Sequence, residues 1–490
     1  MAGSVTAQKR KNTRELQARS AEPALLQRLD VISNENESSS VSLLGGTVRV
    51  LYWESILADT VSASVIFTDA GNTMTTQKKG QGHGKRKKKV SAVEGLPITG
   101  GETVYLKFTD NNGNTLSFND ENGILIINDR PTIPTKSQTS SKTYELILSS
   151  QEFIDNEKER VKYCSAEQPS DQVKTIFEKV LKTKKKIDIE DTKEPLQYTG
   201  NNRKPFYVIN DLSKKSVSAT SQELGVSAGY FFWETSKGYQ FKSIDTLLSG
   251  EKKKKIIYNE SADNKTPKGY DIKALTLDMS SRVNVQKKYQ RGAYSNRSIK
   301  IDPFTTEYKV SIRNAFDPKV QEKLKLGGEK LPTQNKIFDK QGGDAEYSLT
   351  TYYFSTTGQQ HMGKSDEQIE KSQEENFKKD EVVNQSIMRY NQLFASQITI
   401  TIPGEFSLHA GDCVWMDIPE VSESENKACG DDVNKVDGGL YTIADLCHYI
   451  TAKQTYTKLN LIRDSFGRVK KSQNDQASKV MDANFLPNIK

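Results

Sequence analysis

Cysteine is scarce in this sequence, and long apolar runs are missing. Four cysteines in 490 residues are too few for a disulfide framework, so we expect reduced thiols in a cytosolic assembly compartment. The N-terminal segment carries charges but lacks the apolar stretch of a signal peptide. No apolar run reaches the length of about 18 residues that a membrane-spanning helix needs, so the sequence predicts no contact with a membrane.

Hydrophobic residues are also few. They make up 34% of the chain, and charged residues make up 27%. Globular chains usually hold about 45–50% apolar residues, so either the cores are small or long polar loops dilute them. The 70 Lys and Arg exceed the 63 Asp and Glu by only +7. A dedicated DNA-binding domain usually has a denser basic face, so the overall charge does not favour one.

Catalytic motifs are missing as well. The sequence contains neither G-x-S-x-G nor H-E-x-x-H, and its four histidines offer few positions for a histidine-dependent site. Gly84-Lys85 resembles the end of a phosphate-binding loop, but Arg86 stands where Ser or Thr is required. We predict no enzyme, no catalytic residue and no cofactor. A hydrolase acting on cell wall is a weak alternative, because the sequence nominates no carboxylate pair for it.

Two histidines and two cysteines fall within one C-terminal region: His409, Cys413, Cys447 and His448. These residue types bind zinc. However, the C-x₂-C pair is missing, and the adjacent Cys447 and His448 would point to opposite sides of a strand. We therefore predict no metal site and interpret the four as core or strand-face residues.

The main pattern that is present is period-two alternation, which is typical of half-buried antiparallel strands. It runs from Val48 to Phe67 and continues in TVYLKFTDNNGNTLSF, where Asn112-Gly113 predicts a hairpin turn. It returns in residues 271–313 and 396–466. Five or six short strands within the first β region indicate a barrel or sandwich.

Between these regions the apolar period changes to that of a helix. Val173, Ile176 and Phe177 share one face of the segment that begins at Ser170 or Asp171 as N-cap. The aromatic segment GYFFWETSKGYQF then predicts a hairpin with Phe231 and Trp233 on one face and Tyr230, Phe232 and Glu234 on the other. Packing on the preceding helices is the simplest interpretation, and a stacking platform for bases or sugars is the alternative.

Lysine is concentrated in QKKGQGHGKRKKK, residues 77–89, which interrupts two strands and predicts a long hairpin tip. Its candidate contacts for a partner protein or for DNA are Lys85, Arg86, Lys87, Lys88 and Lys89. A cation run binds nucleic acid without sequence preference and with strong salt dependence, although charge runs are more often simply solvated. Lys252–Lys255 form a second run.

The order and spacing of four segments carry a family resemblance. SQITITIPGEFSLHAGDCVWMDIPE has the form of a strand, a Pro-Gly turn and L-x-x-G-D-x-V-x-x-x-I-P. The other three are GGLYTIADLCHYITAKQTYTKLNLIRDSFG, GYFFWETSKGYQFKSIDTLL and QRGAYSNRSIKIDPFTTEY. Together, over about residues 45–466, the chain resembles the central baseplate hub protein of contractile-tailed bacteriophages.

This resemblance implies a mainly β fold with α+β parts: two tail-tube-like antiparallel β-barrel domains plus smaller α/β domains. It implies a homotrimer that forms a pseudo-sixfold ring, adapts the sixfold tail tube to the threefold central spike and lets DNA pass during ejection. Tail tube proteins, the central spike protein and baseplate wedge proteins would be its partners, with transient contact to genomic DNA. Its location would be the tail baseplate of the virion.

Pattern and resemblance together predict six parts. They are a flexible basic arm (1–42), a first barrel with the basic loop 77–89 (43–160), a small α/β domain (161–250), the start of a second barrel at about 271–313 with a polar insertion (251–395), the remainder of that barrel (396–466) and a tail (467–490). Two alternatives stay open: a nucleic-acid-binding protein that uses its lysine-rich loops, and the hub of a related contractile injection system.

Overall fold

The described elements are mainly antiparallel β-strands, as the sequence predicts. The computed structural model describes residues 21–35, 39–71, 74–79, 85–133, 141–219, 228–259, 266–267, 269–279, 284–301, 306, 308–314, 350–355, 379–419, 434 and 436–467. No helix among these residues is long and apolar enough to cross a membrane. The predicted tail from residue 468 onward lies outside the described residues.

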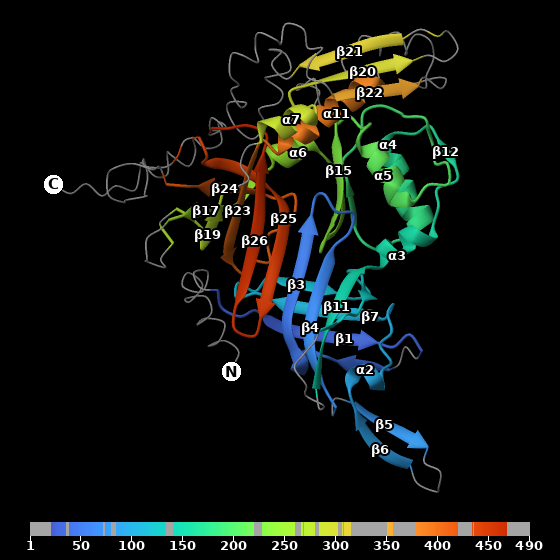
Figure 1. The fold of residues 1–490 in the computed structure, drawn as a ribbon, viewed down its shortest axis with the longest axis vertical. Coiled ribbons are helices and arrows are strands. Elements are labelled where there is room, and N and C mark those ends of the chain that lie inside the picture. Colours follow the sequence, from blue (N-terminus) through green and yellow to red (C-terminus); the bar gives the residue numbers. More distant parts are fainter. Residues whose placement is uncertain are drawn as a thin grey trace, which may run out of the picture.

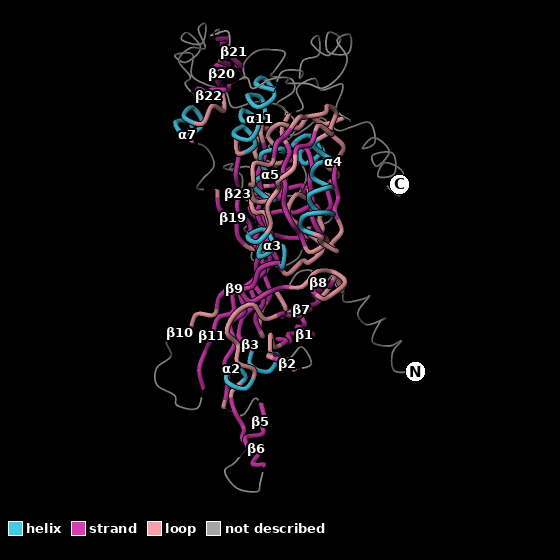
Figure 2. Tube along the Cα trace, turned by 90° about the vertical axis from the view of Figure 1, so that its right-hand side faces the viewer, coloured by secondary structure: helices cyan, strands magenta, loops and turns pink. Residues whose placement is uncertain are grey.

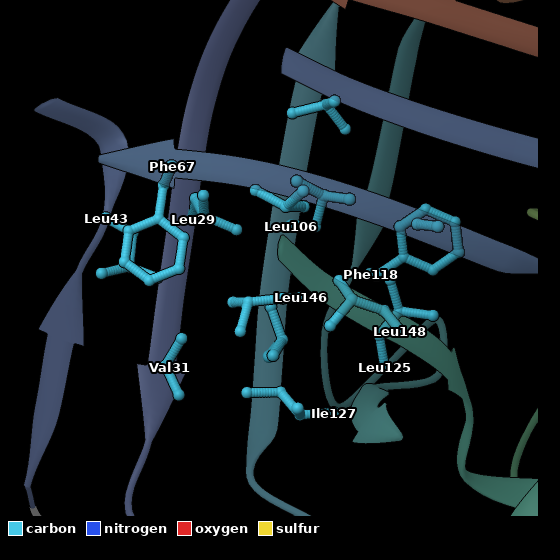
Figure 3. Close-up of a cluster of buried hydrophobic side chains, with 14 of the residues drawn as sticks. Leu29, Val31, Leu43, Phe67, Leu106, Phe118, Leu125, Ile127, Leu146 and Leu148 are labelled. Atoms are coloured by element: carbon cyan, nitrogen blue, oxygen red, sulfur yellow. The ribbon is translucent and has the colours of Figure 1, made fainter. Parts of the chain in front are cut away.

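The first β unit is an antiparallel sheet with the strand order β2-β1-β7-β9-β11-β4-β3. The alternating residues predicted to face inward form one core, which includes Phe67, Leu106, Phe118 and Leu146 (Figure 3). The 3-10 turn η1 (Leu44–Gly46) contacts both β1 and β4, so the sheet curls around this core. The strands are β1 (Leu25–Ile32), β2 (Ser40–Ser42), β3 (Thr47–Ser55), β4 (Ser62–Ala70), β7 (Thr103–Thr109), β8 (Thr115–Phe118), β9 (Leu125–Asp129), β10 (Thr132–Ile133) and β11 (Ser141–Ser150).

The predicted flexible arm over residues 1–42 is wrong for its C-terminal part. Strand β1 pairs with β7 along its length, and Leu29 and Val31 are fully buried in the core. Burial of these two side chains and the ladder with β7 offset the conformational entropy of ordering this segment. Residues 1–20 lie outside the described residues.

The strands of the second β unit form a cycle that the chain closes between β18 and β19, which are not paired with each other. The order is β17-β24-β25-β26-β23-β19, and β18 pairs with the other side of β17. Only Leu275 separates β18 from β19, and its amide donates to the Thr401 carbonyl at 2.7 Å, so the path returns to its start. Every strand of the cycle except β19 gives a buried side chain to one core. The strands are β17 (Lys252–Tyr258), β18 (Ile272–Ala274), β19 (Thr276–Asp278), β23 (Ser396–Pro403), β24 (Cys413–Asp417), β25 (Gly439–Thr451) and β26 (Thr455–Arg463).

The predicted limits of the second barrel need two corrections. The segment before residue 271 contains β17, which pairs in parallel with β24 and β18. Strands β20 (Ser295–Ile301) and β21 (Tyr308–Asn314) do not belong to the barrel, because they form a separate distal sheet with β22 (Thr350–Ser355). Helix α11 (Lys379–Leu393), which the prediction placed in a polar insertion, packs on β20 and β21 of this distal sheet.

A small α/β unit lies between the two β units in the chain. Its N-cap differs from the prediction, because α4 begins at Pro169 with Gln168 as N-cap, and proline suits the first helical position. Its elements are α3 (Gln151–Lys158), β12 (Cys164–Ser165), α4 (Pro169–Thr175), the π-helical turn η2 (Ile176–Leu181), β13 (Ile187–Ile189), β14 (Tyr198–Thr199), α5 (Pro205–Ser213), β15 (Tyr230–Thr235), β16 (Gly238–Ser243) and α6 (Ile244–Ser249). Helix α7 (Val285–Gln290) precedes β20.

The aromatic hairpin β15–β16 serves two cores, and its predicted faces are confirmed. Tyr230 and Phe232 pack in the core of the small unit with residues of α4, α5 and η2. Phe231 and Trp233 pack on the opposite face with residues of β25, β26 and α11. In Figure 1, β15 lies between the second β unit and the helices α4 and α5.

The two β units form one continuous sheet. Strand β25 pairs with β26 and β24, and its C-terminal part also pairs with β3 of the first unit, with His448 opposite Tyr52. The molecule is elongated, as Figure 2 shows. The two-stranded ribbon β5–β6 (Met74–Lys79 and Lys85–Val90) projects at one end and the distal sheet lies at the other (Figure 1).

Candidate functional site: contact surfaces and the junction between units

The sequence-predicted cations Lys85–Lys89 lie in strand β6 rather than at the tip of a loop. Strand β6 pairs with β5 in an antiparallel ribbon, with Lys78 opposite Arg86 and Thr76 opposite Lys88. We call β5 and β6 the basic ribbon. It extends away from the first β unit (Figure 1), and the strand that contains the five consecutive cations is part of this projection.

The base of the basic ribbon is anchored to the first β unit. Helix α2 (Ala92–Gly95) follows β6, and the buried carboxylate of Asp69 in β4 accepts hydrogen bonds from the amides of Ala92 and Val93, both at 2.9 Å. Gly95 approaches the side chains of Met74 and Val90 so closely that a Cβ there would lie 2.9 Å from the Met74 sulfur. These contacts fix the ends of the ribbon to the sheet.

The second lysine run, Lys252–Lys255, is not a free cationic loop. It belongs to β17, and Lys253 forms a 2.6 Å ion pair with Asp412. Lys254 lies 3.4 Å from the carboxylate of Glu405, and the ammonium of Lys252 lies 5.5 Å from the ring centre of Trp415. The structure therefore assigns these lysines to contacts within the second β unit.

The distal sheet has an exposed apolar edge strand. Tyr308, Val310 and Ile312 alternate along β21, and their exposed fractions are 72%, 43% and 41%. The register places Val310 beside Ile299, and Tyr308 beside the exposed Ile301. Exposed apolar patches on sheet edges are typical of contact surfaces.

A buried ionic cluster joins the small unit to the first β unit. The ammonium of Lys185 lies 2.6 Å from a carboxylate oxygen of Glu152 and 2.6 Å from one of Glu234. Glu234 also accepts hydrogen bonds from the Val61 amide and the Ser150 hydroxyl. Burial alone would lower the pKa of Lys185, but the two carboxylates raise it. The lysine therefore stays charged within the junction.

A second buried cluster joins all three units. The Glu54 carboxylate of β3 contacts the imidazole of His409 at 3.2 Å and accepts hydrogen bonds from the amides of Ser236 and Ala410 and from the hydroxyl of Tyr52. Burial alone would raise the pKa of Glu54, but His409 and these donors lower it to about 2. An ionised Glu54 thus connects β3, the turn of the aromatic hairpin and the loop before β24.

The four residues weighed as zinc ligands have separate surroundings. His409 contacts Glu54, whereas His448 lies between Tyr52 and Phe406, and burial lowers its pKa to about 3. Burial raises the pKa of Cys413 to about 11, and its thiol donates to the Leu247 carbonyl. No group of three or more His, Cys, Asp or Glu side chains is arranged to hold a metal ion within the part of the chain that the structure describes.

Sequence reasoning missed the residues of both ionic clusters, although a signal was present. Val50, Tyr52 and Glu54 follow one period-two face of β3, and Glu234 shares a face with Tyr230 and Phe232. A carboxylate at an inward position requires a buried partner. No local pattern could identify that partner, because Lys185 and His409 are distant in the sequence.

The comparisons with known proteins give structural similarities only. No protein-family model and no curated protein matches this chain. The chain is similar to a tail protein from Neisseria meningitidis, with 9% identity, a TM-score of 0.47 and coverage of 89% of this chain and 96% of that one. The 43 kDa tail protein of prophage MuSo2 from Shewanella oneidensis shows 10% identity, a TM-score of 0.46 and coverage of 90% and 99%.

A component of the Escherichia coli type VI secretion system, itself described as similar to tail proteins of bacteriophage T4, also resembles this chain. It shows 8% identity, a TM-score of 0.38 and coverage of 91% of this chain and 80% of that one.

Proposed function

We propose that this chain is a structural component of a contractile tail baseplate and acts as its central hub. The observation that supports this most is the continuous sheet through β25 and β3, which fixes two β units in one body. Two buried ionic clusters hold the small unit against both of them. A single body of this kind can transmit mechanical load between neighbouring proteins. The segments that resemble those of baseplate hubs contribute strands to it.

In this proposal three chains form a pseudo-sixfold ring between the sixfold tail tube and the threefold central spike, and DNA passes through the ring. Closed symmetric rings satisfy the interfaces of all their subunits at once. Wedge proteins are proposed to bind the outside of the ring, and the ring is proposed to assemble in the host cytoplasm. A hub of a related contractile injection system uses the same architecture.

Electron microscopy of the purified chain mixed with its spike protein tests the proposal. We expect rings with threefold symmetry in which two β units per chain produce six similar lobes around a channel. If the two proteins comigrate, and therefore bind each other, but the particles contain no ring, the proposal is contradicted.

The basic ribbon supports a second candidate function, which is nonspecific binding of DNA. Five consecutive cations on a projecting ribbon can reach phosphates. We favour contact with a neighbouring tail protein, because lysines along a DNA channel would hold the DNA that has to pass.

A further inference from the structure

A cavity of about 550 Å³ lies where the three units meet. The first β unit contributes strand β8 and Glu121 to the lining of this cavity. The small unit contributes Lys186 and the turn of the aromatic hairpin. The second β unit contributes the loop that contains Ser407 and His409. A cavity at a junction of units is a common place for a ligand.

The charge of the lining is mainly positive. Lys185, Lys186 and Lys237 line the cavity, and Glu121 is its one carboxylate side chain. Glu152 and Glu234 neutralise Lys185. Neither Lys186 nor Lys237 forms an ion pair with another described residue, so both ammonium groups can bind an anion.

The backbone holds these two lysines next to each other. The Tyr239 amide donates to the Lys186 carbonyl at 2.9 Å, immediately beside Lys237 and Gly238. Gly238 has a φ of 117°, and a Cβ there would lie 2.1 Å from the Lys186 carbonyl oxygen, so only glycine permits this approach. Partial burial and the charge of Lys253 lower the pKa of Lys237, whereas the carboxylates of Asp412 and Glu54 act in the opposite direction.

We propose that this cavity binds an oxyanion group, a phosphate or a carboxylate, between Lys186 and Lys237. The site goes beyond the proposed hub function and does not depend on it. The hydroxyl of Ser236 lies on the same hairpin turn and lines the cavity with the two lysines, so it is placed to donate a hydrogen bond to the same group. Charge-assisted hydrogen bonds from ammonium groups to such oxygens are stronger than neutral ones.

Isothermal titration calorimetry of the full chain tests this proposal, with sodium phosphate and an acetylated tetrapeptide of aspartate and glutamate as probes at constant ionic strength. We expect saturable binding of at least one probe. Tighter binding of phosphate would identify a free anion as the source of the oxyanion, and tighter binding of the peptide would identify an acidic protein segment.

The double variant Lys186→Gln and Lys237→Gln should weaken that binding by about tenfold or more, because two charge-assisted contacts are lost. Both side chains are exposed, so we expect the melting temperature to stay near that of the wild type. The matched control is Lys174→Gln with Lys179→Gln, which removes two exposed charges outside the cavity. No saturable binding by the wild type, or equal weakening in both double variants, would overturn the proposal.

Discussion

At the residue scale, the ionisation of Glu54 makes the stability of the folded chain depend on pH. Its lowered pKa means that the ionised carboxylate stabilises the folded chain above its ordinary pKa of 4.5, and that this contribution disappears as the pH falls toward about 2. The pH-dependent part amounts to about 3 kcal/mol, since each pKa unit is worth about 1.4 kcal/mol. We expect Glu54→Gln to destabilise the chain most at pH 7 and progressively less between pH 4.5 and 2.

Urea unfolding of the wild type and the variant at pH 7 and pH 3 measures this difference. Glu157→Gln is the matched control, because Glu157 pairs with Lys204 at the surface with half of its side chain exposed. If the destabilisation by Glu54→Gln were the same at both pH values, the pKa of Glu54 would not be lowered in the folded chain.

Lys185 provides a second test at the residue scale. Lys185→Met leaves two carboxylates buried without a cation and should cost about 3–5 kcal/mol of the free energy of unfolding. Adding Glu152→Gln and Glu234→Gln should recover part of that loss. Lys204→Met, which breaks an exposed pair, should cost less than about 1 kcal/mol by the same denaturant titration. An equal loss in both lysine variants would contradict the assigned role of the cluster.

At the scale of elements, the aromatic hairpin connects the small unit to the second β unit. Trp233 is buried on the face opposite Phe232, and its indole NH donates to the Ala410 carbonyl at 3.0 Å. We expect Trp233→Ala to cost about 3–5 kcal/mol and to split calorimetric unfolding into two transitions. Phe232→Ala should destabilise the small unit without loosening this contact. A single transition in Trp233→Ala at an unchanged temperature would refute the connection.

The basic ribbon gives an element-scale test between its two candidate partners. Replacing Lys85, Arg86, Lys87, Lys88 and Lys89 by Gln should leave the melting temperature unchanged, because the ribbon is anchored through Asp69 and α2. Fluorescence anisotropy with duplex DNA should show weak binding that disappears in the variant. Tight wild-type binding with a slope of log affinity on log salt near about −4.5, as five phosphate contacts predict, would favour the DNA-binding function instead.

Local alternation predicted the strands whose inward residues are apolar. It identified the hairpin of β7 and β8, the two faces of β15 and the β region that contains β26. It did not identify β17, because four lysines precede its buried pair Ile256 and Ile257. Both of its partners pair in parallel, and β24 lies far away in the sequence. It also missed β1, whose buried residues Leu29 and Val31 follow a stretch compatible with a helix.

At the scale of the whole molecule, the limits of the units depend on contacts that no short segment encodes. The pairing of β25 with β3 joins residues about 400 positions apart, as the register of Asp445 with Ser55 shows. The limits of the distal sheet also depend on a pairing between distant residues. Strand β22 pairs with β20 although a long segment of the chain separates the two strands. Alternation indicated two β regions, and only the resemblance implied that they form two similar units in one chain.

The central claim is that three copies of this chain form a hub. Light scattering of the purified chain, alone and mixed with its spike protein, measures the assembly directly. We expect a mass of about 165 kDa, three times the 55.0 kDa of one chain, in at least one of these conditions after the mass of the spike is subtracted. A strictly monomeric mass of 55.0 kDa in both conditions would contradict it.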